Sequence, residues 1–248
     1  MPAPISVREI SKSFFDEGRG EIHAVNAVSF ECREGEVFGL LGANGAGKTT
    51  TLRMLSTIIA PSSGSASILG HDVVTDAENV RKNLGFYSAS TALYPRLTAR
   101  ETIKFFAQIN QYPPGRVTER VNYLIERFGI TKYADSRVDR LSSGMKQKVS
   151  IARTVAHDPR IVIFDEPTVG LDVLNALEVQ DSIRQLRSEG KTIIFSTHIM
   201  SEAEKLCDRI AIIHGGRILA CDTLANLRDS SGQHYLEDIF IHHVRDRA

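Results

Sequence analysis

The chain has 248 residues, of which 42% are hydrophobic and 24% are charged, and its formal net charge at pH 7 is zero. This balance argues against a broadly basic surface, so no nucleic-acid partner is expected. The three cysteines form no C-x-x-C pair, which favours buried thiols in a reducing compartment over a disulfide scaffold. No apolar run approaches the roughly 20 residues that span a bilayer, so we expect a soluble cytosolic chain that reaches the membrane only through a partner.

Short strands are predicted on both sides of a polar loop near the start of the chain. Residues 5–7 and 25–30 have strand-like apolar patterns, and residues 16–20 between them are charged or glycine. We expect these strands to form a small antiparallel layer beside a main sheet.

An apolar strand at 37–41 leads into a glycine-rich loop and then into a helix that opens at 50–55. The loop fits G-x-x-x-x-G-K-[ST], the phosphate-binding pattern of nucleoside triphosphatases. Its glycines let backbone N–H groups turn toward an anion, and the helix start adds a positive dipole end. Lys48 is expected to reach the β- and γ-phosphates, and the Thr49 hydroxyl to ligate Mg²⁺. The loop comprises Gly42, Ala43, Asn44, Gly45, Ala46, Gly47, Lys48 and Thr49.

Residues 93 to about 155 show helical spacing and no strand signal. Thr98 and Glu101 match a capping box, with Thr98 as the cap. Apolar residues then recur at helical spacing until a Pro-Pro-Gly break at 113–115, and the pattern resumes over 117–128. These features predict a helical insertion between two halves of an α/β core.

A second anion-binding cap is predicted at the end of this insertion, ahead of a helix at 149–155. Ser142 can offer a hydroxyl, and Gly144 an unhindered N–H, to an anion at the N-terminus of that helix. Taken alone, such a pattern is more typical of an ordinary helix cap. Because the glycine-rich loop already serves the chain's own phosphates, this cap suggests phosphates brought by another molecule. The motif comprises Leu141, Ser142, Ser143, Gly144 and Met145.

Apolar runs later in the chain predict four more strands. Residues 161–164 and 192–195 are near-continuous apolar runs, which are typical of parallel strands covered on both faces. Residues 210–213 and 217–219 flank a Gly-Gly pair and predict two strands joined by a tight turn.

The first of these runs ends in Asp165-Glu166-Pro167, which delivers two acids to the carboxyl edge of the sheet, where ligands of such folds bind. Asp165 is expected to hold Mg²⁺, directly or through its water. Glu166 is the candidate general base that orients the attacking water against the γ-phosphate. The alternative is a turn of acids without chemistry, and the phosphate loop in the same chain weakens it.

The glycine loop, the L-S-S-G-M motif and the acid pair, in this order, resemble the nucleotide-binding domain of ATP-binding cassette (ABC) transporters over almost the whole chain. The resemblance implies an α/β fold with a P-loop NTPase (RecA-like) core, a small N-terminal antiparallel β layer and an inserted α-helical subdomain. It implies one domain over 1–248, in which 1–91 and 156–230 form the core. Residues 92–155 would form the helical subdomain and 231–248 a C-terminal helical tail.

The resemblance also assigns residues that spacing alone does not. Phe14 stands where the family stacks an aromatic ring on adenine, with Phe15 or plain core packing as alternatives. Thr50 joins the ATP-binding loop, and Asp172 matches the loop that carries communication between subunits. His198, just past an apolar strand, would contact the γ-phosphate and help hold the attacking water. The implied catalytic residues are Glu166, His198 and Lys48, with ATP and Mg²⁺ as cofactors.

The signature motif departs from the family pattern. It is L-S-S-G-M rather than L-S-G-G-Q, so Ser143 and Met145 replace a glycine and a glutamine. Ser142 and Gly144, the groups expected to touch phosphate, remain. The resemblance therefore still implies that this motif contacts ATP bound to a second subunit.

A second departure concerns the metal. Family members have a glutamine that ligates Mg²⁺ and senses the membrane partner, and by register it falls at Ala89, which has no donor or acceptor. Ser88, Ser90 or a water would then take its role, or metal binding would rest on Thr49 and Asp165. We expect weakened but retained hydrolysis.

The stretches 84–101 and 195–209 resemble the sodium-exporter (NatA-type) branch, whose separate ATPase subunits work with a permease to expel Na⁺. The resemblance implies an integral membrane permease as partner, which would hold the chain at the inner face of the cell membrane. It also implies a head-to-tail dimer, with a second copy or a homologous subunit, around two ATP molecules. Drug, lipid and polysaccharide exporters carry similar motifs, and a non-transport cassette ATPase is a further alternative.

Overall fold

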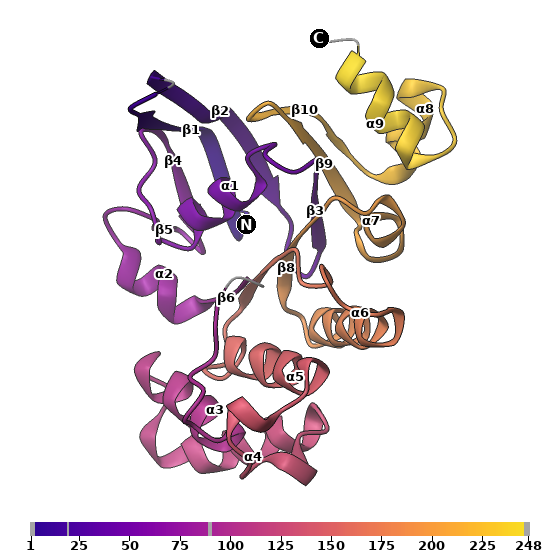
Figure 1. The fold of residues 1–248 in the computed structure, drawn as a ribbon. Coiled ribbons are helices and arrows are strands. Elements are labelled where there is room, and N and C mark those ends of the chain that lie inside the picture. Colours follow the sequence, from indigo (N-terminus) through magenta and orange to yellow (C-terminus); the bar gives the residue numbers. More distant parts are fainter. Residues whose placement is uncertain (1–2, 19, 89–90, 246–248) are drawn as a thin grey trace.

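The computed structural model describes residues 3–18, 20–88 and 91–245. A four-stranded antiparallel sheet with strand order β2-β1-β4-β5 lies at the start of the chain (Figure 1). This confirms the predicted antiparallel layer, although its strands are longer than the sequence patterns indicated, and two of them were not predicted. The strands are β1 Ile5–Asp16, β2 Gly20–Cys32, β4 Ser63–Ile68 and β5 His71–Asp72.

The main sheet has six strands in the order β10-β9-β3-β8-β7-β6. Every neighbouring pair is parallel except β9 and β10, which form the predicted hairpin. The strand at the β6 edge was not predicted, because its sequence L-G-F-Y-S is short and carries a glycine. The strands are β3 Val37–Leu41, β6 Leu84–Ser88, β7 Ile161–Asp165, β8 Thr192–Thr197, β9 Arg209–His214 and β10 Arg217–Asp222.

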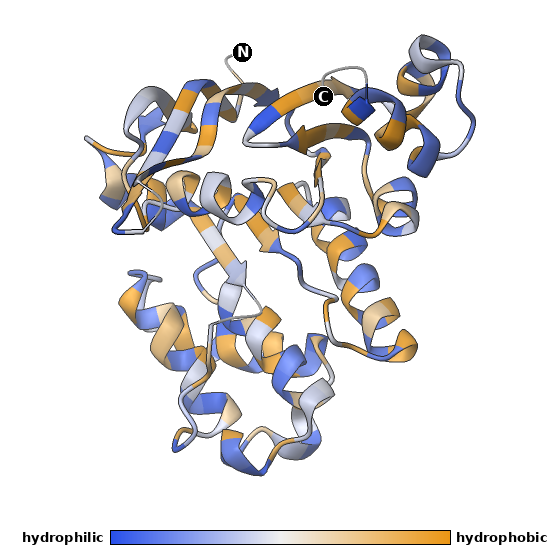
Figure 2. Cartoon of the chain, turned by 45° about the horizontal axis from the view of Figure 1, so that its top comes forward, coloured by the Kyte–Doolittle hydropathy of each residue, from blue (hydrophilic) through white to orange (hydrophobic). Residues whose placement is uncertain are grey.

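Both faces of the parallel sheet are covered, which explains the continuous apolar runs. Along β7, Ile161 and Ile163 pack into one hydrophobic cluster, while Val162 and Phe164 pack into another. Figure 2 shows apolar residues along these strands and on the helices that lie against them. The helices outside the insertion are α1 Lys48–Leu55, α2 Ala77–Asn83, α6 Val173–Ser188, α7 Met200–Leu206, α8 Leu224–Ser231 and α9 Leu236–Arg245.

The described part of the predicted insertion contains helices and no strand longer than a single bridge, between Thr98 and Arg137. Its main helices are α3 Ala99–Ile109, α4 Val117–Arg127 and α5 Ser143–Thr154, which lie together below the sheet in Figure 1. The capping box is confirmed: Thr98 Oγ1 accepts from the N–H of Glu101, and the Glu101 carboxylate accepts from the N–H of Thr98. Short 3₁₀ turns at Pro114–Arg116, Thr131–Tyr133 and Val138–Arg140 connect these helices.

The register of the parallel strands decides which side chains meet at the carboxyl edge. Leu41, the last residue of β3, is paired with Thr197 of β8, and Asp165, the last residue of β7, is paired with Ser196. The segments that follow these three strands therefore begin side by side. They carry the glycine-rich loop, Glu166 and His198.

Two further expectations concern membrane-spanning segments and the burial of the three cysteine thiols. No helix in the described ranges is both long and apolar enough to cross a bilayer. All three cysteines are free thiols, but only Cys32 is buried, while Cys207 and Cys221 are partly exposed. The expectation of three buried thiols is thus correct for one of them.

Candidate active site

The glycine-rich loop joins the end of β3 to the start of α1. Gly47 precedes the helix with φ of 104°, a backbone conformation that side chains with a Cβ rarely adopt. A Cβ at Gly47 would also lie 2.6 Å from the carbonyl oxygen of Ala24 on β2. At Gly42 a Cβ would collide with the carbonyl oxygen of Ile213. Close backbone approach therefore requires glycine at both positions, and α1 begins at Lys48, two residues earlier than expected.

The Lys48 side chain is 4% exposed, and its ammonium lies against the backbone of this loop. Its Nζ donates to the carbonyl oxygens of Gly42 at 2.7 Å and of Ala43 at 3.1 Å. It also forms an ion pair with Oε1 of Glu166 at 2.9 Å. Lys48 thus links the phosphate loop to the acid pair across the edge of the sheet.

Asp165 ends β7 and is almost fully buried. Its Oδ1 accepts hydrogen bonds from the hydroxyls of Ser196 at 2.8 Å and Thr49 at 3.2 Å. Burial raises the pKa of Asp165, and these two hydrogen bonds offset only part of the rise. The Thr49 hydroxyl and the Asp165 carboxylate are hard oxygen donors that meet at one point, which fits the ligand preference of Mg²⁺.

Glu166 follows directly and has the left-handed backbone conformation, with φ of 47°. Non-glycine residues in this region store backbone strain, which persists where surrounding contacts fix it. Here the Glu166 N–H donates to Ser196, with the hydroxyl oxygen at 3.0 Å and the carbonyl oxygen at 3.2 Å. With the backbone held in this turn, the Glu166 carboxylate contacts Lys48.

His198 follows β8 and approaches the same carboxylate. Its Nδ1 lies 3.5 Å from Oε1 of Glu166. Burial opposes ionisation of Glu166, but Lys48 and His198 outweigh it, so the pKa of Glu166 lies below its usual value. The structure therefore brings the three predicted catalytic residues, Lys48, Glu166 and His198, together around a single carboxylate oxygen.

Phe14 lies on the antiparallel sheet, not on the sheet that carries the loop. It pairs with Ile22 of β2 and is 44% exposed, and the Lys12 ammonium lies 5.4 Å from its ring centroid. Phe15 is 83% exposed. Neither ring is therefore packed in the core.

The helix that carries the signature motif starts earlier than predicted. We expected it at 149–155, but α5 begins at Ser143, so Gly144 and Met145 lie in its first turn. Ser142 is the cap, and its Oγ accepts from the N–H of Met145 at 3.3 Å. The motif's polar character concealed this turn from a pattern based on apolar periodicity. In Figure 1, α5 lies well apart from α1 and its phosphate loop.

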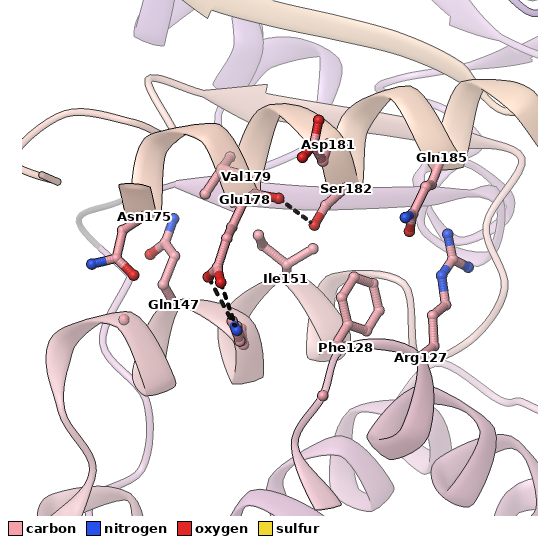
Figure 3. Close-up of a pocket in the computed structure, with 13 residues that line it drawn as sticks. Arg127, Phe128, Gln147, Ile151, Asn175, Glu178, Val179, Asp181, Ser182 and Gln185 are labelled. Atoms are coloured by element: carbon pink, nitrogen blue, oxygen red, sulfur yellow. Dashed lines mark hydrogen bonds and ion pairs between the residues drawn. The ribbon is translucent and has the colours of Figure 1, made fainter. Parts of the chain in front are cut away.

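Gly144 has a packing role that the sequence did not indicate. A Cβ at Gly144 would collide with Oδ1 of Asn175 in the first turn of α6. The Asn175 N–H donates to Asp172 Oδ1 at 3.0 Å, and its side-chain amide donates to Oδ2, so Asp172 caps α6. Asn175 therefore links the predicted signature motif to Asp172 within one chain. Gly144 and Asn175 line a groove of about 280 Å³ between α5 and α6 (Figure 3). In the same groove Lys148 pairs with Glu178 at 3.1 Å.

Other polar residues support the site without having been singled out. Ser196 bridges Asp165 and Glu166, and only its place in Ser-Thr-His could have suggested it. Gln147 of α5 accepts from the Tyr87 hydroxyl at 2.8 Å and donates to the carbonyl oxygen of Pro167 at 2.8 Å. No sequence signal predicts such a bridge. Ala89, where the family's glutamine falls, lies outside the described residues.

Comparison with known proteins agrees with this geometry. The family model described as "ABC transporter" matches residues 25–169. The chain is 40% identical to the ABC transporter ATP-binding protein NatA of Bacillus subtilis over 96% of both chains. It is 36% identical to the linearmycin resistance ATP-binding protein LnrL of Bacillus subtilis, over 84% of this chain and 67% of that one.

Solved structures indicate the same family. An ATP-binding subunit of an ABC transporter superposes with a TM-score of 0.86 at 28% identity, covering 97% of this chain and 99% of that one. A dimeric bacterial ABC transporter cassette superposes with a TM-score of 0.79 at 26% identity, over 89% and 98%. The predicted α/β P-loop fold is confirmed. The chain belongs to the ABC transporter family as an ATP-binding subunit, an ATP hydrolase by the chemistry of that family.

Proposed function

We propose that the chain is the ATPase subunit of an exporter, which dimerises around two ATP molecules and drives a separate membrane permease for Na⁺ or another cation. The observation that carries the hydrolytic part is the convergence of Lys48 and His198 on Oε1 of Glu166, at 2.9 Å and 3.5 Å. The cation rests on the resemblance of 84–101 and 195–209 to the sodium-exporter branch.

The ion pair between Lys48 and Glu166 gives a specific order of events. A triphosphate carries more negative charge than one carboxylate, so ATP draws the Lys48 ammonium onto its β- and γ-phosphates. Glu166 then loses the neighbour that most strongly lowers its pKa and becomes a better base. Its carboxylate accepts a proton from the water that attacks the γ-phosphorus, while His198 holds that water in line.

Thr49 and Asp165 are the residues that would hold Mg²⁺, since their oxygens lie 3.2 Å apart beside Lys48. When bound there, Mg²⁺ neutralises charge on the phosphate oxygens. The Thr49 hydroxyl would then turn its proton away from the carboxylate. Ser196 continues to donate to Asp165, so the orientation of that carboxylate is kept.

The proposed dimer places the signature motif of one subunit against ATP held by the other. Its separation from the chain's own phosphate loop in Figure 1 supports this arrangement. Four exposed apolar side chains lie in the loop after the acid pair and on the first turns of α6, and exposed apolar patches often mark protein interfaces. The patch comprises Val169, Val173, Leu174 and Leu177, of which Val173 and Leu174 are each 75% exposed.

A cavity of about 320 Å³ between the end of β6 and α5 is the proposed docking site for a cytoplasmic helix of the permease. It is lined by Tyr87 and Leu93 on one side and by Lys146 and Gln147 on the other. Gln147 also contacts Pro167, next to Glu166. Docking there would hold the chain at the inner face of the cell membrane and connect the partner to the hydrolytic site.

Export of an organic molecule is the second candidate, because the similar LnrL protein is named for linearmycin resistance. Co-reconstitution of the chain with its permease in vesicles separates the two. ATP-dependent uptake of radioactive Na⁺ that disappears with Glu166→Gln would support cation transport. Hydrolysis stimulated by an organic substrate, with no cation flux, would favour the second candidate.

The dimer has its own test. Glu166→Gln with excess ATP should elute from size exclusion as a dimer, because unhydrolysed ATP keeps the two subunits together. A variant that binds ATP yet stays monomeric would contradict the proposed dimer.

A further inference from the structure

A cluster of four buried polar side chains adjoins the segments that carry Glu166 and His198. The proposed mechanism does not use this cluster. Glu202, in the first turn of α7, is its centre. The Thr168 hydroxyl donates to Oε2 of Glu202 at 3.0 Å, and the Thr197 hydroxyl donates to the same oxygen at 2.8 Å. Gln180 of α6 approaches Oε1 at 3.5 Å. All four residues are 2–6% exposed, and we call them the Glu202 cluster.

The cluster connects the two segments that carry the catalytic pair. Thr168 lies two residues after Glu166 and opens the loop toward Asp172. Thr197 immediately precedes His198, and its hydroxyl oxygen also accepts from the N–H of Ile199 at 3.0 Å. One hydroxyl therefore joins the residues on both sides of His198, and Glu202 fixes its orientation by accepting its proton.

The cluster also reaches the phosphate loop through the backbone. The carbonyl oxygen of Thr197 accepts from the N–H of Gly42 at 3.3 Å. A shift of Thr197 would thus move His198 relative to both Glu166 and the phosphate loop. Such a shift matters because in-line attack requires the reacting groups to be held within a fraction of an ångström.

The carboxyl group of Glu202 is held by hydroxyl and amide donors. Within residues 3–18, 20–88 and 91–245, no Lys, Arg or His forms an ion pair with Glu202. A buried carboxylate without a cation is held only by its hydrogen bonds, and an apolar side chain in its place would avoid the desolvation penalty. A carboxyl oxygen at this place accepts from both hydroxyls and so keeps the two donors in one arrangement, which an apolar side chain could not do.

We infer that Glu202 is a positioning residue that sets the place of His198 relative to Glu166 through Thr197 and Thr168. This inference rests on the proposed roles of Glu166 and His198. Because Thr168 begins the loop toward Asp172, Glu202 also connects that loop, expected at the subunit interface, to the histidine.

Thr197→Val tests this most sharply, because valine keeps the shape and strand propensity of threonine but removes the hydroxyl. We expect kcat to fall by about ten- to a hundredfold, with KM for ATP little changed. Glu202→Gln, which keeps an acceptor, should retain more activity than Glu202→Leu. Thr102→Val is the matched control, since Thr102 is also buried and, among the residues that the structure describes, its hydroxyl bonds only the carbonyl oxygen of Thr98, at 2.8 Å. It should leave kcat unchanged.

A double-mutant cycle identifies the route of the effect. If Thr197 acts through His198, then Thr197→Val should cause no further loss of single-turnover hydrolysis in the His198→Ala background. Additive losses, or a Thr197→Val enzyme with the wild-type kcat, would overturn the inference alone. Absence of hydrolysis in the wild-type protein would overturn the proposed function as well, so the two failures are distinguishable.

Discussion

The ion pair between Lys48 and Glu166 makes the nucleotide-free site testable by thermal unfolding. Glu166→Gln preserves the shape of the side chain and one acceptor but removes its charge. Lys48, only 4% exposed, keeps the carbonyl oxygens of Gly42 and Ala43. Within the described part of the chain, it loses the one carboxylate with which it forms an ion pair.

Removing one partner of a fully buried ion pair typically costs about 3–5 kcal/mol. The Glu166 side chain is 22% exposed and glutamine still accepts a hydrogen bond, so screening and the retained bond reduce the loss to about 1–2 kcal/mol. In a chain of this length each kcal/mol shifts Tm by about 2–4 °C. The nucleotide-free variant should therefore melt about 2–8 °C below the wild type.

The sign of the pH dependence follows from the lowered pKa of Glu166. A carboxylate whose pKa is lower in the folded protein than in the unfolded chain stabilises the fold above the unfolded pKa. That contribution is lost as the pH falls through the folded pKa. The difference in Tm between wild type and variant should therefore persist at neutral pH and begin to shrink near the ordinary glutamate pKa of about 4.3. It should vanish only when the pH is below the lowered pKa of folded Glu166.

Differential scanning fluorimetry measures both effects. With ATP and Mg²⁺ the order should reverse, because the variant retains ATP and ligand binding stabilises the folded state. Asp181→Asn is the control, since it removes an exposed ion pair with Arg184 and should leave Tm unchanged. A nucleotide-free Glu166→Gln protein as stable as the wild type would refute the reasoning.

Three further outcomes are expected. Because burial raises the pKa of Asp165, its charge destabilises the nucleotide-free fold, so Asp165→Asn should raise Tm while abolishing Mg²⁺-dependent hydrolysis; a lower Tm would contradict this. Leu174→Glu places a charge on a side chain that is 75% exposed. It should weaken ATP-dependent dimers of Glu166→Gln by size exclusion without changing Tm, and intact dimers would exclude this patch from the interface. Ala89→Gln should raise the hydrolysis rate or the Mg²⁺ affinity in an ATPase assay, and no change in either would remove the idea that this position limits turnover.

The phosphate loop and the strands around it could be predicted from the sequence, because both depend on local rules. A glycine loop of this pattern between an apolar strand and a helix predicts a phosphate-binding loop. Continuous apolar runs at 161–164 and 192–195 predict strands that are buried on both faces. The capping box at Thr98 was equally local. Where such a rule was weak, as in β6 and in the polar first turn of α5, the prediction missed the element or its start.

The arrangement of the site depended on the order of the strands in the sheet, which no local sequence pattern reveals. Residues 48, 166 and 198 are far apart in the chain, and they meet because β3 and β7 both lie beside β8 in the sheet. Their roles as catalytic groups remain predictions, but their convergence on one oxygen is a property of the fold. The Glu202 cluster and the close approach of Gly144 to Asn175 also depend on segments that are distant in the sequence.

The sequence by itself therefore determined which chemical groups the protein has and which local structures carry them. Only the tertiary structure decided which groups that are distant in the sequence form a hydrogen bond or an ion pair, or approach closely. The physical reason is range: capping, glycine conformation and apolar periodicity act over a few residues. Desolvation of Asp165, the pairing of Lys48 with Glu166 and the burial of Glu202 arise only when distant segments exclude water together.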